Sequence, residues 1–85
     1  MNICVNSTFD CSIEDFRAMV KRFEDEIRKS VSEWKIAVVN DHEVIMMLNV
    51  ADMDGLQTLM SSPEMTQWDA DNNCVDLIYS LEKLN

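Results

Sequence analysis

Apolar side chains recur at a helical period in the first third of the chain. The stripe comprises Ile13, Phe16, Met19, Val20, Phe23, Ile27 and Val31. Steps of mostly three and four residues place these side chains on one face of an α-helix. Ser12 stands at the N-cap position and Asp15 follows three residues later, an arrangement that resembles a capping box with a shorter acid. The pattern predicts a helix from about residue 13 to residue 31.

Two short apolar runs rich in β-branched residues come next, at 34–39 and 44–50. The polar tetrad 40–43 between them has turn-forming side chains, so the runs are predicted to be antiparallel strands joined by a turn. Apolar and polar residues alternate again over 75–82, and more weakly over 3–9. Both segments are predicted to be strands.

A second helical region is expected between the third and fourth strands. Apolar residues at helical spacing follow Asp52, which predicts a helix with Asp52 at its N-cap. Ser62-Pro63-Glu64 offers a second N-cap, a proline at the first helical position and an acid in the first turn. The helix is therefore predicted to restart there and to run through Trp68, with a loop at 71–73.

The predicted order is strand, helix, strand, strand, helix, strand, in a single domain of residues 1–85. This order predicts an α+β fold of the ferredoxin-like βαββαβ type, in which two helices cover one face of a four-stranded antiparallel sheet. With 85 residues there is room for one core. A chain this short is of marginal stability unless it is cross-linked or oligomeric.

Strand alternation allows the two faces of the predicted sheet to be compared. One face is expected to lie under the helices and to be apolar almost throughout, with Ile3, Val5, Ile36, Val38, Val44, Met46, Leu48, Val50, Val75, Leu77, Tyr79 and Leu81. The other face is expected to carry Cys4, Asn6, Thr8, Ala37, Val39, Ile45, Met47, Asn49, Asp76, Ile78 and Ser80. A solvated sheet face is normally polar, and an apolar patch on it usually marks an interface.

We therefore predict a homodimer, joined sheet against sheet about a two-fold axis. The predicted interface residues are Val39, Ile45, Met47 and Ile78. The alternative is a monomer in which some apolar side chains are simply exposed, as is common.

The element order, the length and the broken second helix over 59–65 resemble the dimeric α+β-barrel superfamily, which includes the antibiotic-biosynthesis-monooxygenase-like proteins. The resemblance extends over essentially the whole chain and implies a homodimer with a pocket between sheet and helices. The superfamily includes cofactor-free monooxygenases, haem-degrading enzymes and isomerases, so the fold does not select one activity. Asn6 matches a first-strand asparagine of the haem-degrading members, but Leu59 and Asp69 stand where those members have tryptophan and histidine. Without an axial ligand, no haem is expected.

The charge is strongly acidic and unevenly distributed. The chain has 16 acidic and 7 basic residues, a net charge of −9, which excludes a general nucleic-acid or anionic-membrane binder. Residues 36–85 hold nine of the acids and a single base, Lys83. A pocket formed by this half has no base to hold a carboxylate or phosphate, so neutral, apolar or cationic ligands, or a basic protein partner, are favoured.

Other candidate chemistry is sparse. Three cysteines without motif spacing indicate free thiols in a reducing compartment, and the absence of a signal or membrane-spanning segment predicts a cytoplasmic protein. His42, the only histidine, falls in a predicted turn with no nucleophile or acidic partner spaced for a triad. The acidic segments 50–61 and 69–80 do not meet the EF-hand pattern, so no metal is predicted.

Three functional hypotheses follow. The first is a homodimer that binds a neutral or apolar small ligand, or a protein partner, without catalysis and without a cofactor. The alternative is a cofactor-independent monooxygenase-like enzyme acting on an apolar aromatic substrate, with Asn6, Trp68 and Tyr79 as candidate pocket residues. The third is an acidic accessory protein that docks on a basic partner.

Overall fold

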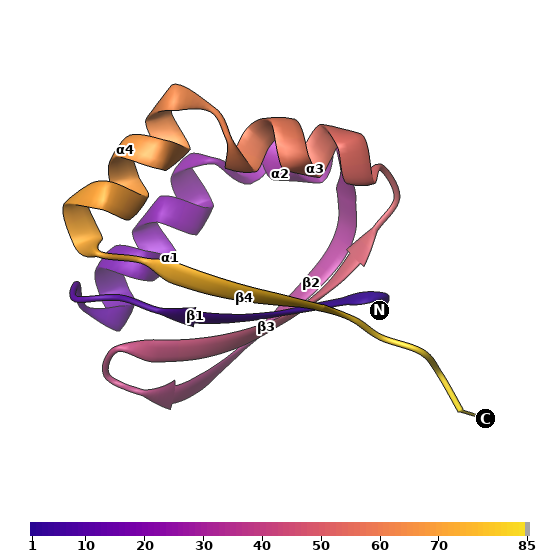
Figure 1. Ribbon diagram of the computed structural model, residues 1–85, viewed down its shortest axis with the longest axis horizontal. Helices are drawn as coiled ribbons and strands as arrows, with labels where there is room; N and C mark the ends of the chain where they lie inside the picture. The colour runs from indigo at the N-terminus through magenta and orange to yellow at the C-terminus, as the bar shows by residue number, and fades with distance from the viewer. Residues whose placement is uncertain (85) are drawn as a thin grey trace.

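The computed structural model describes residues 1–84, which form four strands and four helices (Figure 1). In chain order these are β1 (Ile3–Thr8), α1 (Ile13–Arg22), α2 (Glu24–Arg28), β2 (Val31–Asn40), β3 (Glu43–Val50), α3 (Met53–Met60), α4 (Pro63–Asn72) and β4 (Val75–Ser80). The predicted order of elements is confirmed, with each of the two helical regions divided in two. Among the described residues, no helix has the length and apolar character needed to cross a membrane.

The strands form one antiparallel sheet in the order β2-β3-β1-β4. Its two central strands, β1 and β3, pair with Ile3 opposite Leu48 and Val5 opposite Met46. All four helices lie on the same side of the sheet (Figure 1). This is the predicted ferredoxin-like α+β arrangement.

The first helical region is shorter than predicted. Helix α1 ends at Arg22, its C-cap residue Phe23 has φ −96° and ψ 6°, and the short α2 ends at Arg28. Val31 is the first residue of β2, pairs with Val50 and is fully buried. Because Val31 follows Ile27 by four residues, its burial in the strand has the same spacing as one more turn of helix, and the apolar period alone could not separate the two.

The caps of the second helical region are confirmed. The Asp52 carboxylate accepts from the Gly55 backbone N–H at 3.0 Å, and the Ser62 hydroxyl accepts from that of Met65 at 3.4 Å. A Cβ at Gly55 would collide with the side chains of Ser30 and Asp52, so glycine lets α3 begin this close to the turn before β2. The loop predicted at 71–73 is largely the end of α4, and only Asn73 leaves the helix, with φ 49°.

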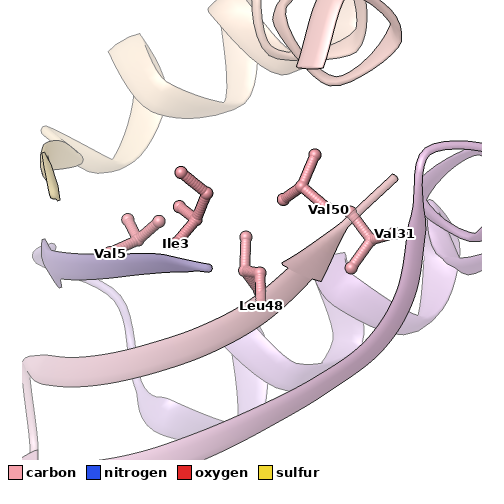
Figure 2. Close-up of a cluster of buried hydrophobic side chains, with 5 residues drawn as sticks. All are labelled: Ile3, Val5, Val31, Leu48 and Val50. Carbon is pink, nitrogen blue, oxygen red and sulfur yellow. The ribbon is translucent and has the colours of Figure 1, made fainter. Parts of the chain in front are cut away.

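The core between sheet and helices consists of two apolar clusters. The first comprises Ile3, Val5, Val31, Leu48 and Val50, which gather on the helix-facing side of β1, β2 and β3 (Figure 2). The second comprises Phe9, Phe16 and Val44. Phe16 stacks on Phe9 with ring centroids 4.8 Å apart, and Trp68 meets its edge at 6.2 Å.

The predicted face of β4 is wrong. Val5, whose side chain faces the helices, pairs with Ile78 on β4, and the buried Ser7 pairs with Asp76. Strand alternation therefore places Asp76, Ile78 and Ser80 on the helix side and Val75, Leu77 and Tyr79 on the open side. The prediction assumed that the more apolar set of β4 lies under the helices. In the structure this set lies on the open side of an edge strand, where Leu77 is 51% exposed.

Candidate functional site

A cavity of about 70 Å³ lies between the sheet and the helices. Its apolar walls are Phe16, Met19, Val20, Ile27, Val31, Trp34, Met46, Leu48, Leu56, Leu59, Met60 and Met65. Every strand and every helix contributes lining residues. Ligand pockets of drug-sized molecules are typically about 300–1,000 Å³, so the cavity in this conformation suits a much smaller molecule.

Methionines give these walls room to adjust. Met19, Met46, Met60 and Met65 come from α1, β3, α3 and α4, respectively. Their unbranched side chains adapt to differently shaped ligands more readily than branched ones do. Such walls suit ligands of more than one shape.

The polar lining residues are Ser7, Asp69, Cys74 and Asp76. Ser7 is 1% exposed, and its hydroxyl donates to Asp76 Oδ1 at 2.5 Å. The Cys74 thiol lies 3.6 Å from the same oxygen. Terminal atoms of Asp69, Cys74 and Asp76 all lie within 4.8 Å of one another. The apolar cavity thus has a polar cluster, defined here as these four residues.

Local structure assembles this cluster from distant parts of the chain. Ser7 and Asp76 are opposite each other in the β1–β4 pair. Asp69 lies near the end of α4, and the left-handed Asn73 lets the Cys74 N–H return to the Asp69 carbonyl at 2.9 Å. The turn from α4 into β4 therefore brings Asp69, Cys74 and Asp76 together.

Two members of the polar cluster, Cys74 and Asp69, have raised pKa values. Burial, followed by the charges of Asp76 and Asp69, strongly raises the pKa of the Cys74 thiol. Burial and the neighbouring Asp76 charge also raise the pKa of Asp69. Both shifts follow from removing water around groups that would be negative beside another negative group.

The same three side chains are the residues that could hold a metal ion in the described part of the chain. Cysteine binds metals as the thiolate, and the raised pKa of Cys74 opposes thiolate formation. Two carboxylates alone make a weak set of ligands for zinc, which is usually held by three or four protein ligands. The cluster therefore fits hydrogen bonding or ion pairing better than resident metal binding.

The predicted pocket residues do not meet in this cavity. Asn6 lies on the open face, where its amide donates to Glu43 Oε2 at 2.9 Å. Tyr79 is also on the open face and 54% exposed. Trp68 packs against Phe16 in the core. Within one chain, the three therefore lie in two separate places.

The predicted interface residues are largely at the surface. Val39 is 50% exposed, and Ile45 and Met47 are exposed on the open face. Ile78 is exposed too, but it lies on the helix side of β4, beyond the cover of the helices. The open face of β4 instead presents Val75, Leu77 and Tyr79.

His42 lies outside the cavity, in the turn between β2 and β3. Its Nδ1 is 3.0 Å from the Cys11 carbonyl oxygen, and its own carbonyl accepts from the Phe9 N–H. These contacts tie the β2–β3 turn to the segment before α1, which is a structural role.

A second groove, of about 650 Å³, lies among α2, α3 and α4. Most of its lining residues have polar side chains, and Lys29 within it is already paired with Glu26 at 3.0 Å. Such an open, polar surface groove lacks the apolar enclosure typical of small-molecule sites.

Sequence reasoning did not bring the polar cluster together. The alternation of residues 75–82 predicts Asp76 on the open face, and the pattern over 3–9 predicts only a strand around Ser7. One signal was available: Ser7 alternates with Ile3 and Val5 and therefore belongs to the buried face of β1. A buried hydroxyl needs a partner, which could have indicated a polar group nearby.

No protein-family model matches the sequence, and no curated protein matches it either. Solved structures do. The cofactor-independent oxygenase SnoaB from Streptomyces nogalater is 8% identical, with 96% of this chain and 92% of that chain aligned and a TM-score of 0.65. HapK from Hahella chejuensis is 13% identical, with coverages of 100% and 94% and a TM-score of 0.60.

A further solved structure, described as an antibiotic biosynthesis monooxygenase, is 10% identical over the full length of both chains, with a TM-score of 0.56. Identities this low show a shared fold and leave the activity open. The chain therefore shares the ferredoxin-like α+β fold of these three solved structures.

Proposed function

We propose that this protein is a homodimer that binds a small apolar molecule in the cavity between sheet and helices, without catalysing a reaction. The observation that carries the proposal is the cavity itself, which is lined by apolar side chains and has its polar groups in one small cluster. Apolar walls with a few converging polar groups are the usual form of a small-molecule site. Its lining residues include no histidine, the usual base of a hydrolytic triad.

The open face of the sheet supports the homodimer. Ile45, Met47 and Leu77 lie there, together with the aromatic ring of Tyr79. A second copy of the same face is the simplest partner, because a two-fold axis pairs each apolar patch with itself. Val39 at the end of β2 extends the patch. The fold resemblance to dimeric α+β barrels points to the same arrangement.

A titration with benzyl alcohol, a neutral aromatic probe, tests the cavity. The shifts of backbone amide signals in NMR spectra of the full chain should be largest for residues that line the cavity. Val20→Phe should abolish these shifts, because Val20 lines the cavity and a larger side chain would fill it. Val38→Phe is the matched control, since Val38 is 47% exposed and lies outside the cavity. Shifts that are equal in both variants would exclude binding in the cavity.

The second candidate is a cofactor-independent monooxygenase acting on an apolar aromatic substrate. It is favoured by the apolar cavity next to a carboxylate that can accept a proton, and by the shared fold with SnoaB. In such a reaction a ring CH₂ group and O₂ give a ring C=O and water, so the substrate supplies all four electrons. The present cavity volume is small for a fused aromatic ring, which places this candidate second.

Oxygen consumption separates the two candidates. An oxygen electrode with anthrone, a tricyclic ketone with an acidic CH₂ group, would show uptake above the protein-free rate only for the enzyme. Uptake that is lost in Asp76→Asn would establish the monooxygenase. A rate equal to the protein-free rate would leave the binding function.

The proposal also includes a basic protein partner and a cytoplasmic location. The acidic 36–85 half is suited to a basic protein partner, and such an association would weaken strongly with salt. Cys4, Cys11 and Cys74 are free thiols, which supports a cytoplasmic, reducing location.

A further inference from the structure

The charged side chains that line the cavity are all acidic. Its walls are apolar, and its charged lining residues among residues 1–84 are the two carboxyl groups of Asp69 and Asp76. No lysine, arginine or histidine of the described chain lines it. A ligand that fits this cavity must therefore bring both an apolar body and a group that suits two acids.

The hydrogen bonds within the polar cluster limit the ligand groups that can bind to it. The Ser7 hydroxyl donates to Asp76 Oδ1, and the Cys74 thiol points its weak donor at the same oxygen. The donors of the cluster are thus directed at a carboxylate. What remains is acceptor capacity, because an ionised carboxylate has about four lone-pair sites and no donor.

Ligand charge makes the next distinction. A neutral apolar ligand can pack against the walls but has no donor for the two carboxyl groups. An anion would add a third negative group. A primary ammonium has three donors and no acceptor, and its hydrogen bonds to carboxylates are charge-assisted and about twice as strong as neutral ones.

We propose that the cavity selects a small primary amine with an apolar body, whose ammonium group lies between Asp69 and Asp76 while its body packs against the methionine-lined walls. This inference rests on the proposed function, since it specifies the ligand class of the same cavity. The small volume favours a single ring or a short branched chain, and rotation of Met46 or Met65 would admit a larger one.

Three probes of nearly equal shape test the inference. Benzylamine is a cation at neutral pH, benzyl alcohol is neutral and benzoate is an anion. Calorimetric or NMR titration of the full chain at moderate salt should give a dissociation constant for benzylamine roughly tenfold lower than that for benzyl alcohol. Benzoate should bind more weakly than either, because the cluster is negative.

Charge-removing variants locate the effect. Asp76→Asn and Asp69→Asn should each reduce the preference for benzylamine to about twofold or less, while the affinity for benzyl alcohol stays within about twofold. Asparagine at position 76 can still accept the bond from Ser7, so the fold is spared. Asp71→Asn is the matched control, because Asp71 is an exposed acid on the same helix and lies outside the cavity.

The outcomes distinguish a failure of the amine selectivity from a failure of the proposed binding function. Equal binding of benzylamine and benzyl alcohol would overturn the amine selectivity and leave the cavity as a binding site. An equal loss of preference in Asp71→Asn would also overturn it, because a general attraction of cations to an acidic protein would explain the result. If none of the three probes perturbs the cavity, the proposed function itself fails.

Discussion

At the scale of single residues, the ionisation of Asp69 affects both the stability of the protein and the charge of its cavity. Burial and the Asp76 charge raise the pKa of Asp69, so the folded state binds this proton more tightly than the unfolded state does. The resulting stabilisation is fully present below the ordinary pKa of an aspartate and is lost as pH rises through the raised pKa. We expect Asp69→Asn to raise the melting temperature at neutral pH and to lose that advantage in acid.

Melting curves of both proteins from neutral to acidic pH would measure this change. Asp71→Asn is the matched control, because it removes one charge from an exposed position at the same end of α4. A gain for Asp69→Asn that persisted at the acidic end would contradict the assigned cause.

Phe16 is the residue on which the second apolar cluster depends most. It is 1% exposed and touches both Phe9 and Trp68. Phe16→Ala should lower the free energy of unfolding by about 3–5 kcal/mol, through lost transfer energy and the cavity left behind. Urea denaturation followed by circular dichroism at fixed protein concentration would measure it. Arg17→Ala, at an exposed position on the same helix, should change the value by no more than about 0.5 kcal/mol.

At the scale of elements, the turn from α4 into β4 decides whether the polar cluster forms. Asn73 adopts φ 49°, and its side chain donates to Asp10 at 2.6 Å. Asn73→Ala should lower the free energy of unfolding by about 1–2 kcal/mol, because alanine disfavours the left-handed conformation. Asn73→Gly loses the same side-chain bond but keeps the backbone preference, so its loss should be smaller. Equal losses in urea denaturation would show that the hydrogen bond, and not the backbone, matters.

Most elements could be predicted from the sequence because their signals are local. The caps at Asp52 and Ser62 and the turn at 40–43 depend on residues within a few positions of one another. The side of the sheet to which β4 turns its apolar residues is not local. It depends on the pairing with β1, in which Asp76 is opposite Ser7. The alternation of apolar and polar residues in β4 is the same whichever set faces the helices.

At the scale of the whole molecule, the position of the cavity was predictable from the sequence and its polar cluster was not. A pocket between sheet and helices was expected from the fold resemblance, and the structure has a cavity there. Its polar cluster joins β1, α4 and β4, and Ser7 and Asp76 lie 69 positions apart. The register of the sheet brings Ser7 and Asp76 together, and the turn from α4 into β4 adds Asp69 and Cys74. The single base among residues 36–85, Lys83, limited the expected ligand class without locating the site.

The dimer is the prediction that belongs to the whole molecule, and two adjacent residues of β4 test it. Leu77 and Ile78 are 51% and 55% exposed, but register places Leu77 on the open face and Ile78 on the helix side. In the proposed dimer, Leu77→Glu would bury an unpaired charge and should weaken association roughly a hundredfold. Ile78→Glu adds the same charge one residue away and should leave the dimer intact. Sedimentation equilibrium at micromolar concentration would measure both, and a monomeric parent protein, or equal weakening by the two substitutions, would exclude the open face as the interface.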